Sequence, residues 1–444
     1  PPRPYGDRPK PYNQRPARMY GPPPGGRPVP PPPRSPLPPR PEPPPPAPEP
    51  TEVAEGAEAA DAAEAQGRPR PSAPAKGERA TVVVRMTGAR RIANYFRKMV
   101  VKPDFFIEAG SVVNVIDREG ARIGAGFYNP KSELALRMLG AEVEDDFLER
   151  RIKEAVGLRE SMKIDATAWR VCHSEGDGLP GLVIDRYDDV YSIEIFSLGM
   201  LKLLPRIRNM FPKTYASADE RTQELEGFTM PFERAPEGVV VREGNVQFRV
   251  DFTRGHKTGF FCDQRENRAY VAELSKGKDV LDLCCYTGGF AVSAAKAGAN
   301  RVVGIDLDED ALETARQNAR LNKVKVDFLH QDLFNYLRQV KERFDVVIVD
   351  PPKMAKMREE LDDAKKAYFD MNFLAAKVVR PGGVLVSCSC TGLVQPDEFL
   401  RIVQSAGLER ELRTFKVAGA GPDHPISSLY PEGQYLKVVY SRVV

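Results

Sequence analysis

The chain has 444 residues, more than one hydrophobic core usually serves, so about two or three domains are expected. Its hydrophobic content of 41% and charged content of 29% are typical of globular proteins. No stretch approaches the roughly eighteen consecutive apolar residues of a membrane span. The net charge of +3 is unevenly spread, since residues 1–40 carry +7 and the remainder −4. Overall charge therefore does not identify a nucleic-acid partner.

The cysteines and the N-terminal residues indicate the cellular setting. None of the six cysteines forms a C-x-x-C pair and only four histidines are present, which argues against a zinc site. The first residues lack the apolar segment of a secretory signal, and their proline density does not suit an amphipathic transit peptide. We therefore expect a cytoplasmic protein with reduced thiols, no metal and no membrane anchor.

Proline dominates the N-terminal part of the chain. Residues 1–50 hold 24 of the 41 prolines, and an Ala/Glu-rich patch and a second Pro/Arg-rich stretch follow. Because proline fixes φ and removes a backbone donor, we expect a largely disordered tail and linker over 1–79. Two interpretations stay open: a solvated tail, or an arm whose arginines attract RNA phosphates.

The next 170 residues or so read as two small domains. Short β-branched runs between Gly and Asn-Pro turns predict a β-rich domain over 80–143. Apolar residues at helical spacing predict a helix over 145–162, opening a central α+β domain over 144–250. Its further expected elements are strands near 182–187, 190–198, 238–244 and 246–252, and a helix near 203–211.

Strand–helix alternation fills residues 251–444. The expected strands lie at 278–285, 301–307, 324–330, 344–350 and 382–390, and the expected helices at 287–298, 309–322, 333–344 and 367–379. Repeated strand–helix units bury a parallel sheet between helices, so this part predicts an α/β, Rossmann-like doubly wound domain with a C-terminal hairpin.

Acidic residues stand at successive strand ends of this domain, where a doubly wound sheet binds its ligand. Asp282 begins the turn DLCCYTGGF, which lacks the dinucleotide fingerprint G-x-G-x-x-G, while its glycines would let the backbone approach a ligand. Asp306 is placed to accept hydrogen bonds from two ribose hydroxyls, and Asp332 to contact an adenine edge. Each acid alone could equally be a helix N-cap. Together they indicate S-adenosylmethionine, which has a ribose and an adenine but no phosphate. The cofactor-binding residues predicted here are Asp282, Tyr286, Thr287, Gly288, Asp306 and Asp332.

Two further motifs end the fourth and fifth strands. In Asp350-Pro-Pro-Lys the prolines hold the backbone rigid, which predicts that Pro351 and Lys353 face a flat substrate, with an ordinary strand-exit turn as the alternative. In SCSCTG, Cys388 and Cys390 share one face of the strand, one deeper and one at its tip. We expect Cys388 to pack and Cys390 to be a nucleophile, although an inert buried thiol is the alternative for both.

From about residue 105 onward the sequence resembles the family of PUA-domain-containing 23S ribosomal RNA (cytosine-5)-methyltransferases. The matching runs are GAGFYNPKSELALRML, EGDGLPGLVIDRY, GHKTGFFCDQRENR, YTGGFAVSA, DPPK, SCSCTG and DHPISSLYPEGQYLK. The resemblance implies a PUA-like RNA-binding domain over 80–143, a central RNA-facing domain, and a class I S-adenosylmethionine-dependent methyltransferase domain over 251–444. It also implies ribosomal RNA as the partner. The run RRIANYFRKMVVKP departs from the family pattern.

The resemblance also implies roles for individual residues. Cys390 matches the family nucleophile, whose thiolate adds to cytosine C6, and Asp350 is both catalytic, at the cytosine N3/N4 edge, and cofactor-binding. Gln264 and Arg265 become cofactor-pocket residues, with a hydrogen-bonded lid as the alternative, and the segment from His256 to Gly259 precedes them. The second cysteine of other RNA cytosine-5 enzymes is missing after Pro352, so the base that removes the C5 proton is unassigned.

Several alternatives stay open. His424 and Glu432 could line the active site or only hold the C-terminal turn. A related guanine-N7 methyltransferase would not need Cys390, since N7 is already nucleophilic. A non-catalytic RNA-binding or ribosome-assembly protein is the third reading, and the sequence leaves open whether the chain forms a homodimer.

Overall fold

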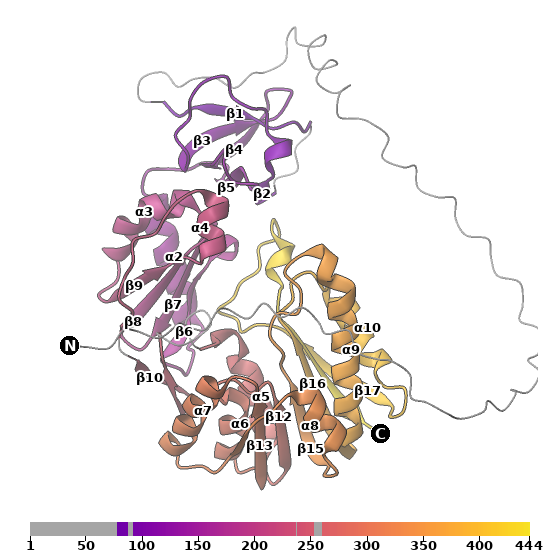
Figure 1. The fold of residues 1–444 in the computed structure, drawn as a ribbon. Helices are drawn as coiled ribbons and strands as arrows, with labels where there is room; N and C mark the ends of the chain where they lie inside the picture. Colours follow the sequence, from indigo (N-terminus) through magenta and orange to yellow (C-terminus); the bar gives the residue numbers. More distant parts are fainter. Residues whose placement is uncertain (1–77, 88–91, 237, 253–259) are drawn as a thin grey trace, which may run out of the picture. The chain divides into compact units, whose positions relative to one another are not determined.

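The computed structural model describes residues 78–87, 92–236, 238–252 and 260–444. The predicted tail lies outside the described residues apart from 78 and 79, and so does the segment from His256 to Gly259. The described residues form four β-sheets and the helices around them (Figure 1). No helix in this part of the chain combines the length and apolarity that crossing a membrane requires.

The first sheet has five strands in the order β1-β3-β4-β5-β2. Its strands are β1 (Thr81–Val83), β2 (Asn94–Tyr95), β3 (Ser111–Ile116), β4 (Arg122–Tyr128) and β5 (Leu136–Gly140), with the short helix η1 (Arg97–Met99) after β2. Alternate residues such as Val113 and Val115 point into a core that also buries Tyr95 and Leu136. This confirms the predicted β-rich unit, to which the structure adds the two-residue strand β2.

The second sheet has four strands in the order β6-β7-β8-β9. Its elements are α2 (Phe147–Ser161), β6 (Ala168–His173), η2 (Ser174–Asp177), β7 (Leu182–Tyr187), β8 (Val190–Ile195), α3 (Leu198–Arg208), β9 (Thr214–Ser217) and α4 (Glu220–Glu226). Ile152 of α2 and Met200 of α3 pack with Ile184 and Ile193 of the sheet. The helix predicted near 203–211 begins earlier, at Leu198, where Ser197 caps it through the Met200 amide.

A separate two-stranded hairpin follows, formed by β10 (Val239–Glu243) and β11 (Val246–Val250). These strands were expected in the central domain, but they do not join its four-stranded sheet. Phe248 and Val250 pack in one cluster with Val292 and Ala319, which belong to helices of the C-terminal part. The same cluster contains Ala168, Tyr187 and Val190, so the hairpin packs against both the central sheet and the C-terminal helices.

The largest sheet has seven strands in the order β14-β13-β12-β15-β16-β18-β17. Its strands are β12 (Asp279–Leu283), β13 (Arg301–Asp306), β14 (Asp327–His330), β15 (Phe344–Val349), β16 (Val379–Ser389), β17 (Leu412–Ala418) and β18 (Lys437–Val443). The first five are parallel, whereas β18 runs antiparallel between β16 and β17. The strand order reverses between β12 and β15, which makes this the switch point of a doubly wound sheet. The predicted architecture and the C-terminal hairpin are confirmed.

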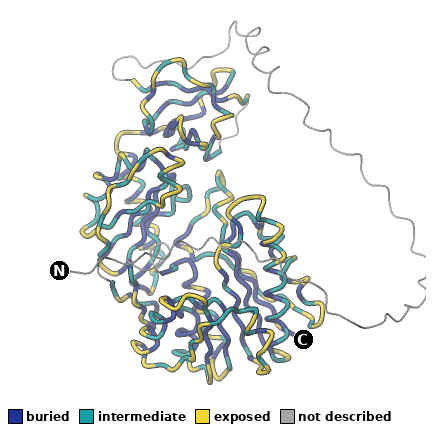
Figure 2. The backbone as a smooth tube through the Cα atoms, in the orientation of Figure 1, coloured by how far each residue is buried: buried dark blue, intermediate teal, exposed yellow. Residues whose placement is uncertain are grey.

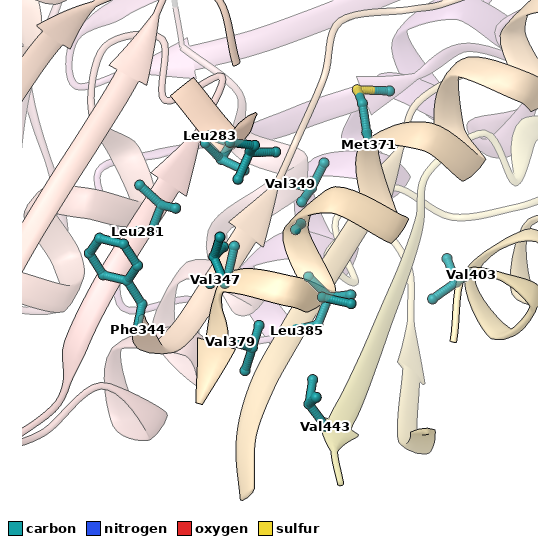
Figure 3. Close-up of a cluster of buried hydrophobic side chains, with 14 of the residues drawn as sticks. Leu281, Leu283, Phe344, Val347, Val349, Met371, Val379, Leu385, Val403 and Val443 are labelled. Atoms are coloured by element: carbon teal, nitrogen blue, oxygen red, sulfur yellow. The ribbon is translucent and has the colours of Figure 1, made fainter. Parts of the chain in front are cut away.

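Helices cover both faces of this sheet. They are α5 (Arg265–Leu274) after η3 (Cys262–Gln264), α6 (Gly289–Lys296), α7 (Glu309–Leu321), α8 (Leu333–Gln339), α9 (Leu361–Val378) after η4 (Arg358–Glu360), and α10 (Pro396–Ser405); η5 (Pro431–Gly433) lies in the last loop. On one face, Val347 and Leu385 pack against Met371 of α9 and Val403 of α10 (Figure 3). On the other, Ile348 packs with helices α5 and α6. Figure 2 shows the buried residues concentrated along the strands.

Several element boundaries differ from the sequence-based prediction. The helix predicted over 333–344 ends at Gln339, because Phe344 already begins β15. The helix predicted from 367 begins at Leu361. Strand β16 ends at Ser389, so Cys390 is the first residue beyond the strand rather than its last.

Candidate active site

The carboxyl ends of the five parallel strands meet at one edge of the seven-stranded sheet. Each predicted strand-end residue lies near the carboxyl end of its own strand or just beyond it. Asp282 lies in β12, Asp306 ends β13, Asp332 follows β14, Asp350 follows β15 and Cys390 follows β16. Because β12 and β15 are neighbours in register, Asp282 and Asp350 lie on adjacent strands at the switch point. The structure therefore brings the predicted acids and the thiol to one edge.

The turn after β12 has an unusual backbone. Cys284 (φ 61°), Tyr286 (φ 50°) and Gly288 (φ 79°) all adopt the left-handed region. Non-glycine residues adopt this region at a cost of about 1–3 kcal/mol each and usually at functional sites. The Tyr286 amide donates to Asp306 Oδ2 at 2.7 Å, and the Thr287 carbonyl accepts from Asn318 Nδ2 at 2.9 Å. These contacts hold the strained turn in place.

Gly288 and Gly289 lie where a side chain would meet the protein interior. A side chain at Gly288 would point inward, with its Cβ 3.0 Å from Phe328 Cζ and 3.1 Å from Ala315 Cβ. At Gly289, a Cβ would lie 3.1 Å from Arg268 Cδ. The protein interior thus leaves little room for a side chain at either glycine, and Gly288 also has a positive φ, while the approach of a ligand to this backbone stays a prediction.

Asp282 is a buried acid with one carboxyl oxygen that has no hydrogen-bond partner among the described residues. It is completely buried, and its Oδ2 accepts a hydrogen bond from the Ala291 amide at 2.9 Å. Its Oδ1 has no hydrogen-bond partner among the described residues. Burial, reinforced by the nearby Asp350 and Asp306, raises the pKa of Asp282 well above its ordinary value. An unpaired buried carboxylate is unfavourable, so a donor-bearing, cationic ligand such as S-adenosylmethionine fits this site.

Asp306 and Asp332 have assigned structural partners of their own. Asp306 accepts from the Tyr286 amide and, at 2.9 Å, from the Asp308 amide, so both of its oxygens are oriented by the backbone. Asp332 caps α8, accepting from the Asn335 amide at 2.9 Å. Asp332 is therefore a helix N-cap, as the alternative prediction stated. A carboxylate oxygen accepts more than one hydrogen bond, so a ligand role stays a prediction for both acids.

Gln264 and Arg265 reach different parts of the site. Gln264 Nε2 donates to Asp350 Oδ2 at 3.2 Å, and its Oε1 accepts from Asn267 at 2.8 Å. The Arg265 guanidinium instead makes a bidentate pair with Asp423, at 3.0 and 2.9 Å, and also bonds Glu266. Gln264 thus touches the predicted base-binding carboxyl, whereas Arg265 is held by the last loop.

Asp350 titrates near neutrality. Burial, followed by the charge of Asp263, raises its pKa to about 7, although Arg268 opposes the shift. After it, Pro351 is buried and Lys353 is exposed. The Met354 amide donates to Thr391 Oγ1 at 3.0 Å, which ties this segment to the residue after Cys390. The prolyl turn and the thiol therefore stand side by side.

The two thiols of the fifth strand differ as expected in exposure. Cys390 is half-buried, whereas Cys388 is 1% exposed and packs in the core, and burial raises the Cys388 pKa well above its ordinary value. Ser389 Oγ donates to the Tyr368 hydroxyl at 3.0 Å, and this hydroxyl is also hydrogen-bonded to Thr391 Oγ1 at 2.7 Å, so Tyr368 holds the side chains on both sides of Cys390. The charge of Asp350 adds to burial in raising the Cys388 pKa.

The last loop contributes residues that sequence reasoning missed. Asp423 is fully buried and accepts from Arg265 and from the Arg170 amide. His424 is buried, with Nδ1 3.1 Å from Asp423 Oδ1, while Glu432 is exposed. The adjacent Asp423 and His424 and, further on, a lysine directly before an apolar run were the available signals. No three His, Cys, Asp or Glu side chains of the described ranges gather as a metal site.

Comparisons with known proteins agree with this geometry. A family model described as S-adenosylmethionine-dependent methyltransferase matches residues 232–413, and a PUA-like domain model matches residues 90–140. The fold and the site at its sheet edge thus define an S-adenosylmethionine-dependent methyltransferase with a PUA-like domain, and S-adenosylmethionine is its cofactor.

Curated relatives narrow the class. The chain is 37% identical over 361 residues to ribosomal RNA large subunit methyltransferase I of Shewanella frigidimarina, covering 76% of this chain and 91% of the relative. It is 35% identical over 381 residues to the protein of the same name from Tolumonas auensis, covering 80% and 96%. The chain belongs to the family of ribosomal RNA large subunit methyltransferase I. A methyltransferase structure from Streptococcus mutans shares the fold, with a TM-score of 0.67, 18% identity, and coverage of 82% of this chain and 100% of that one.

Proposed function

We propose that the protein methylates C5 of a cytosine in large-subunit ribosomal RNA through a covalent adduct with Cys390. The observation that carries the proposal is the position of the half-buried Cys390 thiol directly after β16. The neighbouring strand, β15, is followed by Asp350, whose pKa is raised to about 7. The relatives named ribosomal RNA large subunit methyltransferase I support the substrate class. The PUA-like match supports an RNA partner.

The cofactor would lie against the turn after β12. S-adenosylmethionine supplies an electrophilic methyl group on its sulfonium. The residues proposed to hold it are Asp282, Tyr286, Thr287, Gly288, Asp306 and Asp332, with Gln264 and Asp350 on the β15 side. Arg265, paired with Asp423, is proposed to position this side of the cofactor pocket. The unpaired Oδ1 of Asp282 supports this arrangement, because it offers a buried acceptor to a cationic ligand.

The chemistry asked of Cys390 follows from the weakness of cytosine C5 as a nucleophile. The Cys390 thiolate forms a bond to C6, and the electron pair of the C5–C6 double bond makes C5 nucleophilic. C5 then accepts the methyl group. Loss of the C5 proton to a base and cleavage of the S–C6 bond restore the aromatic ring and the thiolate. A cytosine inside a helix has to leave its stack to reach this site.

Asp350 fits the polar edge of the same base. With its pKa raised to about 7, a large fraction of this carboxyl is protonated at neutral pH. A neutral carboxyl donates one hydrogen bond and accepts another, which matches the N3 acceptor and N4 donor of cytosine. A proton shared with N3 also draws electrons from C6 and favours thiolate addition. Pro351 and Lys353 would flank the base.

The test compares the two thiols. Cys390→Ala should abolish methyl transfer and leave S-adenosylmethionine binding intact, whereas Cys388→Ala should retain transfer and lose about 1 kcal/mol of stability, a typical effect of a core truncation. RNA containing 5-fluorocytosine should trap a covalent complex with wild type and Cys388→Ala, but not with Cys390→Ala. Normal methylation by the Cys390 variant would replace this proposal with a guanine-N7 activity. Absence of cofactor binding in a titration would instead favour a non-catalytic RNA-binding protein.

A further inference from the structure

Lys437 is a buried lysine in the antiparallel strand β18. Lys437 is 2% exposed and has one of the largest fully buried side chains among the described residues. Its Nζ donates to the carbonyl oxygens of Thr391, at 2.7 Å, and Tyr435, at 2.8 Å. None of the described ion pairs joins Lys437 to a carboxylate, and a buried ammonium without an anionic partner is unfavourable. An anion near this nitrogen would therefore be strongly favoured.

The neighbourhood of Lys437 contains Cys390, a group that can become that anion. Lys437 pairs in register with Ser389 of β16, and its ammonium donates to the carbonyl of Thr391, so its backbone lies beside the residue before Cys390 and its ammonium contacts the residue after it. Burial lowers the pKa of Lys437 to about 8, and the charge of Cys390 acts against that shift. The thiol and the ammonium thus interact electrostatically in a site of low polarity.

We propose that Lys437 is the counter-ion of the Cys390 thiolate and keeps this thiol ionised for attack on the base. The inference rests on the proposed function, because it gives the thiolate its use there. Lys437 acts as a positioning residue: it donates to the carbonyl after Cys390 and supplies the positive charge that a nucleophilic thiolate requires.

Other titratable groups also face Cys390. Tyr368 of α9 holds the flanking residues Ser389 and Thr391 by neutral hydrogen bonds, and burial raises its pKa to about 12. Cys388, on the same strand, interacts with Cys390 and is protonated at neutral pH, since burial raises its pKa well above the ordinary value. Lys353, after β15, repels Lys437 and lowers its pKa. Among these groups, Lys437 is the buried cation.

The experiment measures the ionisation of Cys390 without RNA or activity. Full-length protein is alkylated with iodoacetamide across about pH 5–10, and the modified Cys390 peptide is quantified by mass spectrometry, with Cys390→Ala identifying its signal. The wild-type curve should have a midpoint at least about one unit below the ordinary thiol value of about 8.5. In Lys437→Met the midpoint should rise by about 1–2 units, which slows alkylation at pH 7 about tenfold or more. Lys437→Arg should restore most of the wild-type curve.

A matched control separates this effect from general damage. Lys416 lies on the neighbouring strand β17 with its Nζ over the Tyr270 ring, and Lys416→Met should leave the Cys390 curve unchanged. A wild-type midpoint at the ordinary thiol value, or equal midpoints in wild type and Lys437→Met, would overturn the inference. The wild-type curve decides the question even where a variant does not fold.

The 5-fluorocytosine trap keeps the two proposals distinguishable. Adduct formation by wild type with an unshifted alkylation curve in Lys437→Met would refute the role of Lys437 and leave the cytosine-5 proposal standing. A shifted alkylation curve in Lys437→Met, with no 5-fluorocytosine adduct in wild type, would refute cytosine-5 transfer. The ion pair of Lys437 and Cys390 would still be supported. With both proposals correct, Lys437→Met should form the adduct at least about tenfold more slowly at pH 7 and recover as the pH rises.

Discussion

The ion pair of Arg265 and Asp423 offers a sharp test of how the last loop is attached to the catalytic sheet. Arg265 NH1 and NH2 donate to the two carboxylate oxygens at 3.0 and 2.9 Å, and the side chains are 7% and 0% exposed. Although burial opposes ionisation, hydrogen bonds from His424 and Arg265 hold the Asp423 pKa well below its usual range. The pair is therefore desolvated, bidentate and ionised.

The magnitude follows from what each truncation leaves behind. Removing one partner of a buried pair costs about 3–5 kcal/mol, because the other charge stays buried. Asp423→Asn should lower the free energy of unfolding by about 3 kcal/mol, the lower end of this range, because Glu266 still pairs with Arg265. Arg265→Met should lower it by a similar amount. The double variant should lose much less than the sum, giving a coupling free energy above about 1 kcal/mol in a double-mutant cycle.

The assay combines urea unfolding with calorimetric titration of S-adenosylmethionine. A positioning role predicts large losses of stability and, under conditions where the variants are folded, less than about a threefold change in affinity. An Arg265→Met protein of unchanged stability that binds the cofactor tenfold more weakly would refute this reasoning and make Arg265 a direct ligand. Strictly additive stability losses would equally show that the pair is not coupled.

Three other predictions concern single side chains. Asp306→Ala should weaken S-adenosylmethionine binding about tenfold or more, because the proposed ribose contacts and the acceptors of the Tyr286 and Asp308 amides are lost; an unchanged calorimetric affinity would remove Asp306 from the pocket. If a protonated Asp350 serves the base, the pH profile of methyl transfer should show a group near pH 7 whose ionisation lowers the rate, and Asp350→Asn should lack it. Burial, aided by Arg170, lowers the pKa of His173 to about 2, so its contribution to stability is present above the unfolded value of about 6.5 and is lost as the pH falls below it. Urea titrations from pH 7 to pH 5 should show this loss, at up to about 1.4 kcal/mol per pH unit, in wild type and not in His173→Asn.

Local patterns determined much of this molecule. The alternation of strands and helices after residue 251 predicts a doubly wound sheet, because each element buries its own apolar face whatever its neighbours are. Since ligands bind at the carboxyl ends of such strands, Asp282, Asp306, Asp350 and Cys390 could be assigned to one edge from their positions alone. These inferences use only the period of each element and the rules of parallel sheets.

Partners distant in the sequence were decided only by the tertiary structure. The lysine of β18 reaches the carbonyl of Thr391, the residue after Cys390, because the C-terminal strand inserts antiparallel beside β16, and nothing in its local sequence specifies that pairing. The pKa of Asp350 near 7 depends on burial and on Asp263, and the bond between Arg265 and Asp423 joins residues 158 positions apart. Hydrogen bonds and desolvation depend on which groups the folded chain brings within a few ångströms of one another. The sequence therefore determined where the site lies, and the packing of the last strand and loop decided how its groups are charged and held.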